Sequence, residues 1–167
     1  MSAELQAATT TDKSALYDEL AAEAQALLDG ETDRIANAAN LAALIWHGLP
    51  DVNWAGFYFC REGRVGAELV LGPFQGMPAC VRIGLGEGVC GAAAAQMQTQ
   101  VVDDVHAYAG HIVCDAASNS EIVVPLLRGA ELLGVLDLDS PRYARFDAVD
   151  RAGLERLAAL WVASLAQ

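Results

Sequence analysis

Two apolar segments joined by a short connection constrain the fold of this sequence more than any other feature. Residues 121–127 and 131–139 are rich in leucine and β-branched residues, and Arg128, Gly129 and Ala130 separate them. This pattern is typical of a β-hairpin. We therefore expect an antiparallel pair of strands at this point of the chain.

Three acidic residues lie inside these segments, where charged groups are costly to bury. Glu121 opens the first segment, and Asp137 and Asp139 end the second. Because side chains alternate across a strand, Asp137 and Asp139 must face the same side of the sheet. A three-residue turn that pairs Leu127 with Glu131 would place Glu121 opposite Asp137 on that side, whereas a two-residue turn would direct it away.

A shared, half-buried face would change the acidity of these three carboxyl groups. Repulsion between like charges and desolvation should raise at least one pKa, which would make that group a proton donor at neutral pH. The same cluster suits a ligand that carries an ammonium group. The alternative is that Asp137 and Asp139 lie in solvent at a frayed strand end, before a turn at Ser140 and Pro141.

The composition restricts the partners of the protein. The chain has 167 residues, 22 acidic against 10 basic, and a net charge of -12, which disfavours nucleic acid and anionic membranes as partners. No apolar run approaches the roughly eighteen residues of a spanning helix, and the N-terminus lacks the pattern of a secretory signal. We expect a cytoplasmic protein with a loose arm at residues 1–12 and one domain at residues 13–167.

Four cysteines are present, and their spacing fits neither a disulfide scaffold nor a zinc site. We therefore expect no metal and no redox cofactor. Cys114 lies nearest in sequence to the acidic strands, and we include it with the three acidic residues in the candidate active site. Cys60 is interpreted as structural or incidental. Cys90 precedes an alanine-rich segment that favours a short helix, and the N-terminus of a helix lowers the pKa of a thiol.

The remaining elements follow from periodicity and turn residues. Helical spacing predicts three helices. The first covers residues 14–28, the second begins after the capping residue Asp33, and the third begins at Phe146 and Asp147. Strands are predicted over residues 52–60, 66–71, 81–83 and 100–103, with a loop at residues 72–80. Trp54 and Tyr58 lie four apart on a strand and share a face, where they either wall a pocket or pack in the core. The order predicts the α+β class, with a central antiparallel sheet flanked by helices.

Five segments resemble motifs of one known family. They are NWAGFY at residues 53–58, GPFQGMPACVRI at 72–83, GVCG at 88–91, GHIVCDAASNSEIVVPL at 110–126 and GVLDLDS at 134–140. Together they resemble the GAF-domain family, and specifically the free methionine-(R)-sulfoxide reductases. The resemblance covers nearly the whole chain from about residue 17 and implies a GAF fold.

The resemblance implies a role for each cysteine of these motifs. Cys114 would be the nucleophile that attacks the sulfoxide sulfur, releases methionine and becomes a sulfenic acid. Cys80 would resolve this sulfenic acid as a disulfide, which thioredoxin would then reduce. Cys90 matches a third cysteine of the family, either a backup resolving residue or part of the local structure.

The resemblance also implies how the substrate is held. Glu121, Asp137 and Asp139 would bind the ammonium group and protonate or hydrogen-bond the sulfoxide oxygen, and Trp54 and Tyr58 would hold the methyl end. Relatives imply a homodimer that acts against oxidative stress. Two alternatives stay open: a non-catalytic GAF module that senses a small molecule, and a thiol switch that uses the same cysteines without a sulfoxide substrate.

Overall fold

The structure, a computed structural model, describes residues 13–165 and consists of helices packed on a single β-sheet. The expected arm at residues 1–12 lies outside the described residues, so its boundary with the domain stays a prediction. Six strands form one sheet in the order β3-β2-β1-β6-β5-β4, and every neighbouring pair is antiparallel. The strands are β1 (Trp54–Gly63), β2 (Gly66–Gly76), β3 (Arg82–Gly84), β4 (Gln100–Val102), β5 (Ser120–Arg128) and β6 (Glu131–Ser140).

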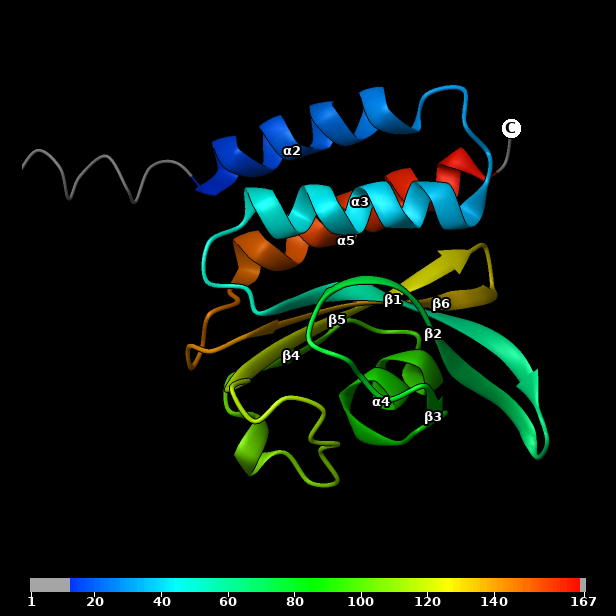
Figure 1. The fold of residues 1–167 in the computed structure, drawn as a ribbon, viewed down its shortest axis with the longest axis vertical. Coiled ribbons are helices and arrows are strands. Elements are labelled where there is room, and N and C mark those ends of the chain that lie inside the picture. Colours follow the sequence, from blue (N-terminus) through cyan, green and yellow to red (C-terminus); the bar gives the residue numbers. More distant parts are fainter. Residues whose placement is uncertain (1–12, 166–167) are drawn as a thin grey trace, which may run out of the picture.

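Helices cover both faces of this sheet, which confirms the expected α+β class. Figure 1 shows α3 (Arg34–Gly48) and α5 (Ala148–Ser164) against one face, with α2 (Lys13–Leu28) packed over them. The short helix α4 (Gly88–Gln96) and the 3-10 helix η1 (Val105–Ala107) lie on the other side. None of the helices in the described part of the chain is long and apolar enough to span a membrane.

The ends of the helices follow the predicted capping residues. The carboxylate of Asp33 accepts hydrogen bonds from the backbone N–H groups of Ile35 and Ala36 at 2.9 and 2.8 Å, and Asp147 caps α5. One strand is longer than predicted: β2 continues to Gly76, through part of the expected loop at residues 72–80. Pairing with β1 overrides the local glycine and proline content there, since Trp54 lies opposite Gly76.

The two faces of the sheet have different compositions because successive side chains alternate across each strand. Phe57, Leu136 and Ile122 face the helices and are fully buried in a core that includes Trp161 of α5. The neighbouring positions on the same strands face α4, and they carry the aromatic and acidic residues that the sequence marked as candidates. The sheet therefore separates the main apolar core from the candidate site.

The hairpin of β5 and β6 has a register that differs from the predicted one. Its turn has two residues, because Arg128 pairs with Glu131, and a two-residue turn alone would direct Glu121 to the helical face. A β-bulge beyond Leu127 adds one residue to β6 and restores the alternation. Glu121 therefore lies opposite Asp139, and not opposite Asp137 as predicted, but the three carboxyl groups still share one face.

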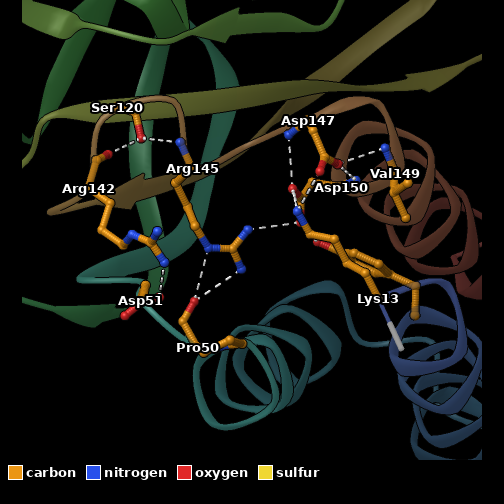
Figure 2. Close-up of polar contacts among 10 residues, drawn as sticks. Lys13, Pro50, Asp51, Ser120, Arg142, Arg145, Asp147, Val149 and Asp150 are labelled. Atoms are coloured by element: carbon orange, nitrogen blue, oxygen red, sulfur yellow. Dashed lines mark hydrogen bonds and ion pairs between the residues drawn. The ribbon is translucent and has the colours of Figure 1, made fainter. Parts of the chain in front are cut away.

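A buried carboxylate links the first turns of α2 and α5. Asp150 of α5 is fully buried, and it pairs with Lys13, the only lysine of the sequence. Its Oδ1 atom accepts from the Tyr17 hydroxyl at 2.8 Å and from the Arg145 guanidinium at 3.1 Å. Figure 2 shows Lys13 and Arg145 converging on Asp150 where α2 and α5 begin.

The same network reaches the end of β5 next to the acidic residues. Arg145 donates hydrogen bonds to the carbonyl oxygen of Pro50, at 3.2 and 3.0 Å. The buried hydroxyl of Ser120 donates to the carbonyl oxygen of Arg142 at 2.6 Å and accepts from the backbone N–H of Arg145 at 3.3 Å (Figure 2). Because Ser120 precedes Glu121, this network fixes the strand end that carries the carboxyl cluster.

Candidate active site

A pocket lies on the sheet face opposite the main core, between the sheet, α4 and the segments around residues 78–79 and 111–118. All eight residues proposed from the sequence lie in it or against it. The lining includes Trp54, Tyr58, Cys90, Cys114, Glu121, Asp137 and Asp139, and Cys80 contacts Cys114 at its edge. Segments far apart in the sequence therefore meet at one site.

The three carboxyl groups form the acidic floor of this pocket. Glu121 and Asp137 are 6% exposed, and Asp139 is half-buried within β6. Burial raises the pKa of all three well above the ordinary value, and mutual repulsion raises it further. The alternative of a frayed, solvated strand end is therefore wrong, and these carboxyl groups lose their protons at a higher pH than ordinary ones.

Cys90 belongs to this acidic cluster and does not have the predicted acidity. Its thiol donates to Oδ2 of Asp137 at 3.2 Å and makes a longer contact of 3.9 Å to Oε1 of Glu121. Burial, followed by the charges of these two carboxyl groups, raises the pKa of Cys90 well above that of a free thiol. The prediction of a lowered pKa was wrong because desolvation outweighs the dipole of α4, although Cys90 does lie in its first turn.

Cys80 and Cys114 meet at the mouth of the pocket. Their sulfur atoms are 2.7 Å apart, with Cys80 half-buried and Cys114 exposed. Desolvation by the surrounding wall, together with the contact to Cys80, raises the pKa of Cys114 to about 12. The sulfur atoms are close enough for a disulfide after a small movement, whereas Cys90 is bound to the carboxyl floor.

Trp54 and Tyr58 form an aromatic wall, and both are buried. Their rings stack with centroids 5.9 Å apart, and Phe74 stacks on Trp54 at 5.2 Å. Each ring also binds the segment that carries Cys80. Trp54 Nε1 donates to the carbonyl oxygen of Met77 at 3.0 Å, and the Tyr58 hydroxyl donates to that of Cys80 at 2.9 Å.

Sequence reasoning missed two groups at this site. His111 Nε2 lies 3.6 Å from Oε2 of Glu121, and burial lowers the pKa of His111, which favours the neutral imidazole. Asn53 donates to Oδ2 of Asp115 and to the Ser118 hydroxyl, both at 3.1 Å. The sequence did contain one signal for His111, which is its position at the start of the stretch that contains Cys114 and Glu121.

One group of side chains could also hold a cation. Cys90, Glu121 and Asp137 place their ligand atoms within 4.8 Å of one another. A thiol and two carboxylates at this spacing are a plausible donor set for a metal ion, although the sequence predicted no metal site. Cys60 lies on β1 outside the residues that line the pocket.

Comparison with known proteins agrees with the motifs in the sequence. Residues 21–163 match the family model of the GAF domain. The chain is 50% identical over 148 residues to the free methionine-R-sulfoxide reductase of Escherichia coli, covering 89% of this chain and 87% of that protein. It is 44% identical over 154 residues to the enzyme of the same name from Saccharomyces cerevisiae, covering 89% and 85%.

A solved structure shows the same arrangement of elements. The free methionine-R-sulfoxide reductase from Neisseria meningitidis, in complex with its substrate, superposes with a TM-score of 0.87 at 43% identity, covering 93% of this chain and 91% of that one. Both the sequence and the fold therefore agree with the resemblance first inferred from the five motifs. The chain belongs to the GAF-domain family and, within it, to the free methionine-R-sulfoxide reductases.

Proposed function

We propose that this protein reduces free L-methionine (R)-S-oxide to L-methionine through a cysteine sulfenic acid and an intramolecular disulfide. One observation carries the mechanism: the sulfur atoms of Cys114 and Cys80 lie 2.7 Å apart at the mouth of a pocket whose floor has three carboxyl groups with raised pKa values. A nucleophile, its resolving partner and an acid are thereby available at one site. Relatives that carry the name of this activity support the assignment.

The pocket has complementary groups for each part of the amino acid. Its lining has five acidic residues and, among the described residues, neither lysine nor arginine, so it favours a ligand with an ammonium group. The first turn of α4 also lines the pocket, and no side chain in the described region caps it. Its N–H groups are suitable partners for the substrate carboxylate, while Trp54 and Tyr58 contact the methyl end.

This recognition explains a preference for the free amino acid over a residue in a protein. A peptide bond would remove the charge from both the amino and the carboxyl group. The acidic floor and the helix terminus would then lose their partners, and buried polar groups without partners are strongly disfavoured. We expect N-acetyl methionine sulfoxide amide to be a poor substrate.

The first chemical step needs a proton donor and a sulfur nucleophile, and because the pKa of Cys114 is raised to about 12, its thiol releases its proton as the sulfur attacks. We propose that the sulfur of Cys114 attacks the sulfoxide sulfur while a carboxyl of the cluster donates a proton to the sulfoxide oxygen. Asp137 is well suited, because it lines the pocket and burial raises its pKa well above the ordinary value. The hydroxyl then migrates from the substrate sulfur to the Cys114 sulfur, the bond between the two sulfur atoms breaks, and the methionine thioether leaves, so that a sulfenic acid remains on Cys114. The cysteine is oxidised by two electrons and the sulfoxide is reduced by two.

The second step regenerates the enzyme. The Cys80 thiol attacks the sulfenic sulfur of Cys114, a disulfide forms, and the hydroxyl leaves as water. A dithiol reductant then restores both thiols by exchange, and thioredoxin is the proposed physiological one. Cys90 is a poor resolving residue by comparison, because its thiol is buried and hydrogen-bonded to Asp137.

Methionine release from the separated epimers tests this proposal. With dithiol reductant in excess, we expect release from the R epimer only, and none from the Cys114→Ser variant. Cys60→Ser is the matched control, because Cys60 lies outside the pocket, and it should keep the native rate. If fully reduced protein releases methionine from neither epimer, the reductase assignment fails and the small-molecule sensor becomes the better interpretation.

The assembly and the location of the protein are separate proposals. The resemblance implies a homodimer in the cytoplasm, which sedimentation analysis and cell fractionation can check. The reaction above uses residues of one chain only, so it does not depend on either.

A further inference from the structure

Cys90 has no assigned step in the proposed reaction, and its surroundings contain the donor atoms of a metal site. Sulfur from Cys90 and oxygen from Asp137 and Glu121 lie within 4.8 Å of one another on the floor of the pocket, and His111 Nε2 lies 3.6 Å from the second oxygen of Glu121. Two acidic residues alone would not indicate a metal ion. A thiol and an imidazole beside two carboxylates, however, form the mixed donor set that zinc prefers.

Three separations among these atoms, two of them to different oxygens of Glu121, approach the edges of a tetrahedron around zinc. Bonds of about 2.3 Å to sulfur and about 2.0–2.1 Å to nitrogen or oxygen give edges of about 3.4–3.6 Å between ligand atoms. The observed separations are 3.2 Å from Cys90 Sγ to Asp137 Oδ2, 3.9 Å from Cys90 Sγ to Glu121 Oε1, and 3.6 Å from His111 Nε2 to Glu121 Oε2. Small rotations of the side chains would therefore equalise them.

An unsatisfied atom on the same floor independently indicates a missing ligand. Oδ1 of Asp137 is buried and has no hydrogen-bond partner within the part of the chain that the structure describes. Asp137 as a whole is only 6% exposed, so solvent does not provide an easy substitute. Leaving such an atom without a partner is unfavourable, and a cation in the pocket would satisfy it.

We propose that Cys90, His111, Glu121 and Asp137 bind a thiophilic divalent cation of the zinc type, and that the bound ion blocks the pocket. On binding, the Cys90 thiol releases its proton to solvent and its sulfur bonds to the ion, with no change of oxidation state. The ion occupies the carboxylates proposed to hold the substrate ammonium group, so ion and substrate compete. The blocking effect rests on the proposed function, whereas the binding itself does not.

The competing thiol pair must be removed before this site can be measured alone. Cys80 and Cys114 lie close together and could bind zinc by themselves, so the test uses the Cys80→Ser/Cys114→Ser protein. Zinc affinity is measured by competition with a chromophoric chelator. We expect one ion per chain, and at least tenfold weaker binding when Cys90→Ser or His111→Ala is added. Adding Cys60→Ser, the matched control, should leave the affinity unchanged.

Cobalt provides a second measurement that needs no change at the site. Co²⁺ bound by the Cys80→Ser/Cys114→Ser protein should show a thiolate-to-metal charge-transfer band and the intense visible bands of tetrahedral coordination. These bands should disappear when L-methionine is added in excess. Absence of the charge-transfer band, or zinc affinity that is unchanged by Cys90→Ser, would overturn the proposal.

The outcomes separate this proposal from the proposed function. In native protein, zinc should inhibit methionine release competitively with the sulfoxide, and a chelator should reverse the inhibition. Active enzyme that binds no zinc at Cys90 would refute the metal site alone. Protein that binds zinc at Cys90 but never releases methionine would refute the reductase assignment alone.

Discussion

The hydroxyl group of Tyr58 donates a 2.9 Å hydrogen bond to the backbone carbonyl oxygen of Cys80. Burial raises the pKa of Tyr58, so this hydroxyl keeps its proton and remains a donor. Trp54 binds the same segment three residues earlier, through the carbonyl oxygen of Met77. The aromatic wall thus has two tasks, because it shapes the pocket and holds Cys80 beside Cys114.

Tyr58→Phe should slow disulfide formation while preserving the aromatic wall. The variant loses one hydrogen bond, worth about 1 kcal/mol, so we expect the rate to fall roughly fivefold. In a single turnover with the sulfoxide, loss of free thiols should lag behind methionine release. The exposed Tyr143→Phe is the control. Equal rates of thiol loss in the native protein and Tyr58→Phe would show that the hydrogen bond does not position Cys80.

Gly134→Ala should destabilise the protein by more than about 3 kcal/mol, because a methyl group there overlaps the backbone carbonyl oxygen of Tyr58. Gly134 also follows the β-bulge that sets the register of Asp137 and Asp139, so activity should fall with stability. Gly129→Ala is the control. It has a positive φ of 61° but open space around it, and it should lose only about 1 kcal/mol. Urea unfolding of both variants checks the difference, and similar losses would contradict it.

Asp137→Asn should stabilise the protein at neutral and alkaline pH while abolishing activity. The pKa of Asp137 is raised in the folded state above its ordinary value of 3.8, so folding binds a proton there. Its contribution to stability is complete below about pH 4 and is lost as the pH rises through the raised pKa. The advantage of the variant should therefore grow with pH.

Thermal unfolding at a series of pH values measures this effect. As the pH rises above the ordinary pKa of 3.8, the melting temperature of native protein should fall more steeply than that of Asp137→Asn. Glu23→Gln, on the exposed side of α2, should follow the native curve. Parallel curves for native protein and Asp137→Asn would refute the raised pKa.

Asp150→Asn should cost about 3 kcal/mol of stability, because Lys13 and Arg145 would be left without a buried anionic partner. Asp18→Asn removes one partner of the exposed ion pair with Arg156, and it should cost no more than about 0.5 kcal/mol. Chemical denaturation compares the two variants. A loss at Asp150 as small as that at Asp18 would mean that the buried network is dispensable for folding.

The sequence predicted most of the fold because its elements have strong local signals. Asp33 caps a helix as expected, the last helix begins next to Asp147 as expected, and the alternation of Asp137 and Asp139 placed both on one face. The register of the hairpin was not predictable in the same way. The register depends on a two-residue turn and on a bulge near Gly134. Each of them shifts the strand pairing by one residue, and the two shifts cancel in the folded sheet.

The sequence predicted which residues form the candidate site, but it did not predict their pKa values. Cys90 was expected to be acidic from its place at the start of a helix. Desolvation and two neighbouring carboxyl groups reverse that effect, and burial of this kind depends on strands distant in the sequence. The hydrogen bonds from Trp54 and Tyr58 were also invisible in advance, because backbone carbonyl groups have no signature in a sequence.

The division of the sheet into an apolar face and an acidic face has an evolutionary consequence. Residues such as Phe57 and Leu136 pack against the helices, whereas residues that would determine ligand choice project from the opposite face. Substitutions of the acidic residues around the pocket therefore leave the packing of the main core unchanged. In such a scaffold, substitutions on the pocket face of the sheet can change the ligand, while selection preserves the residues on the face that packs against the helices.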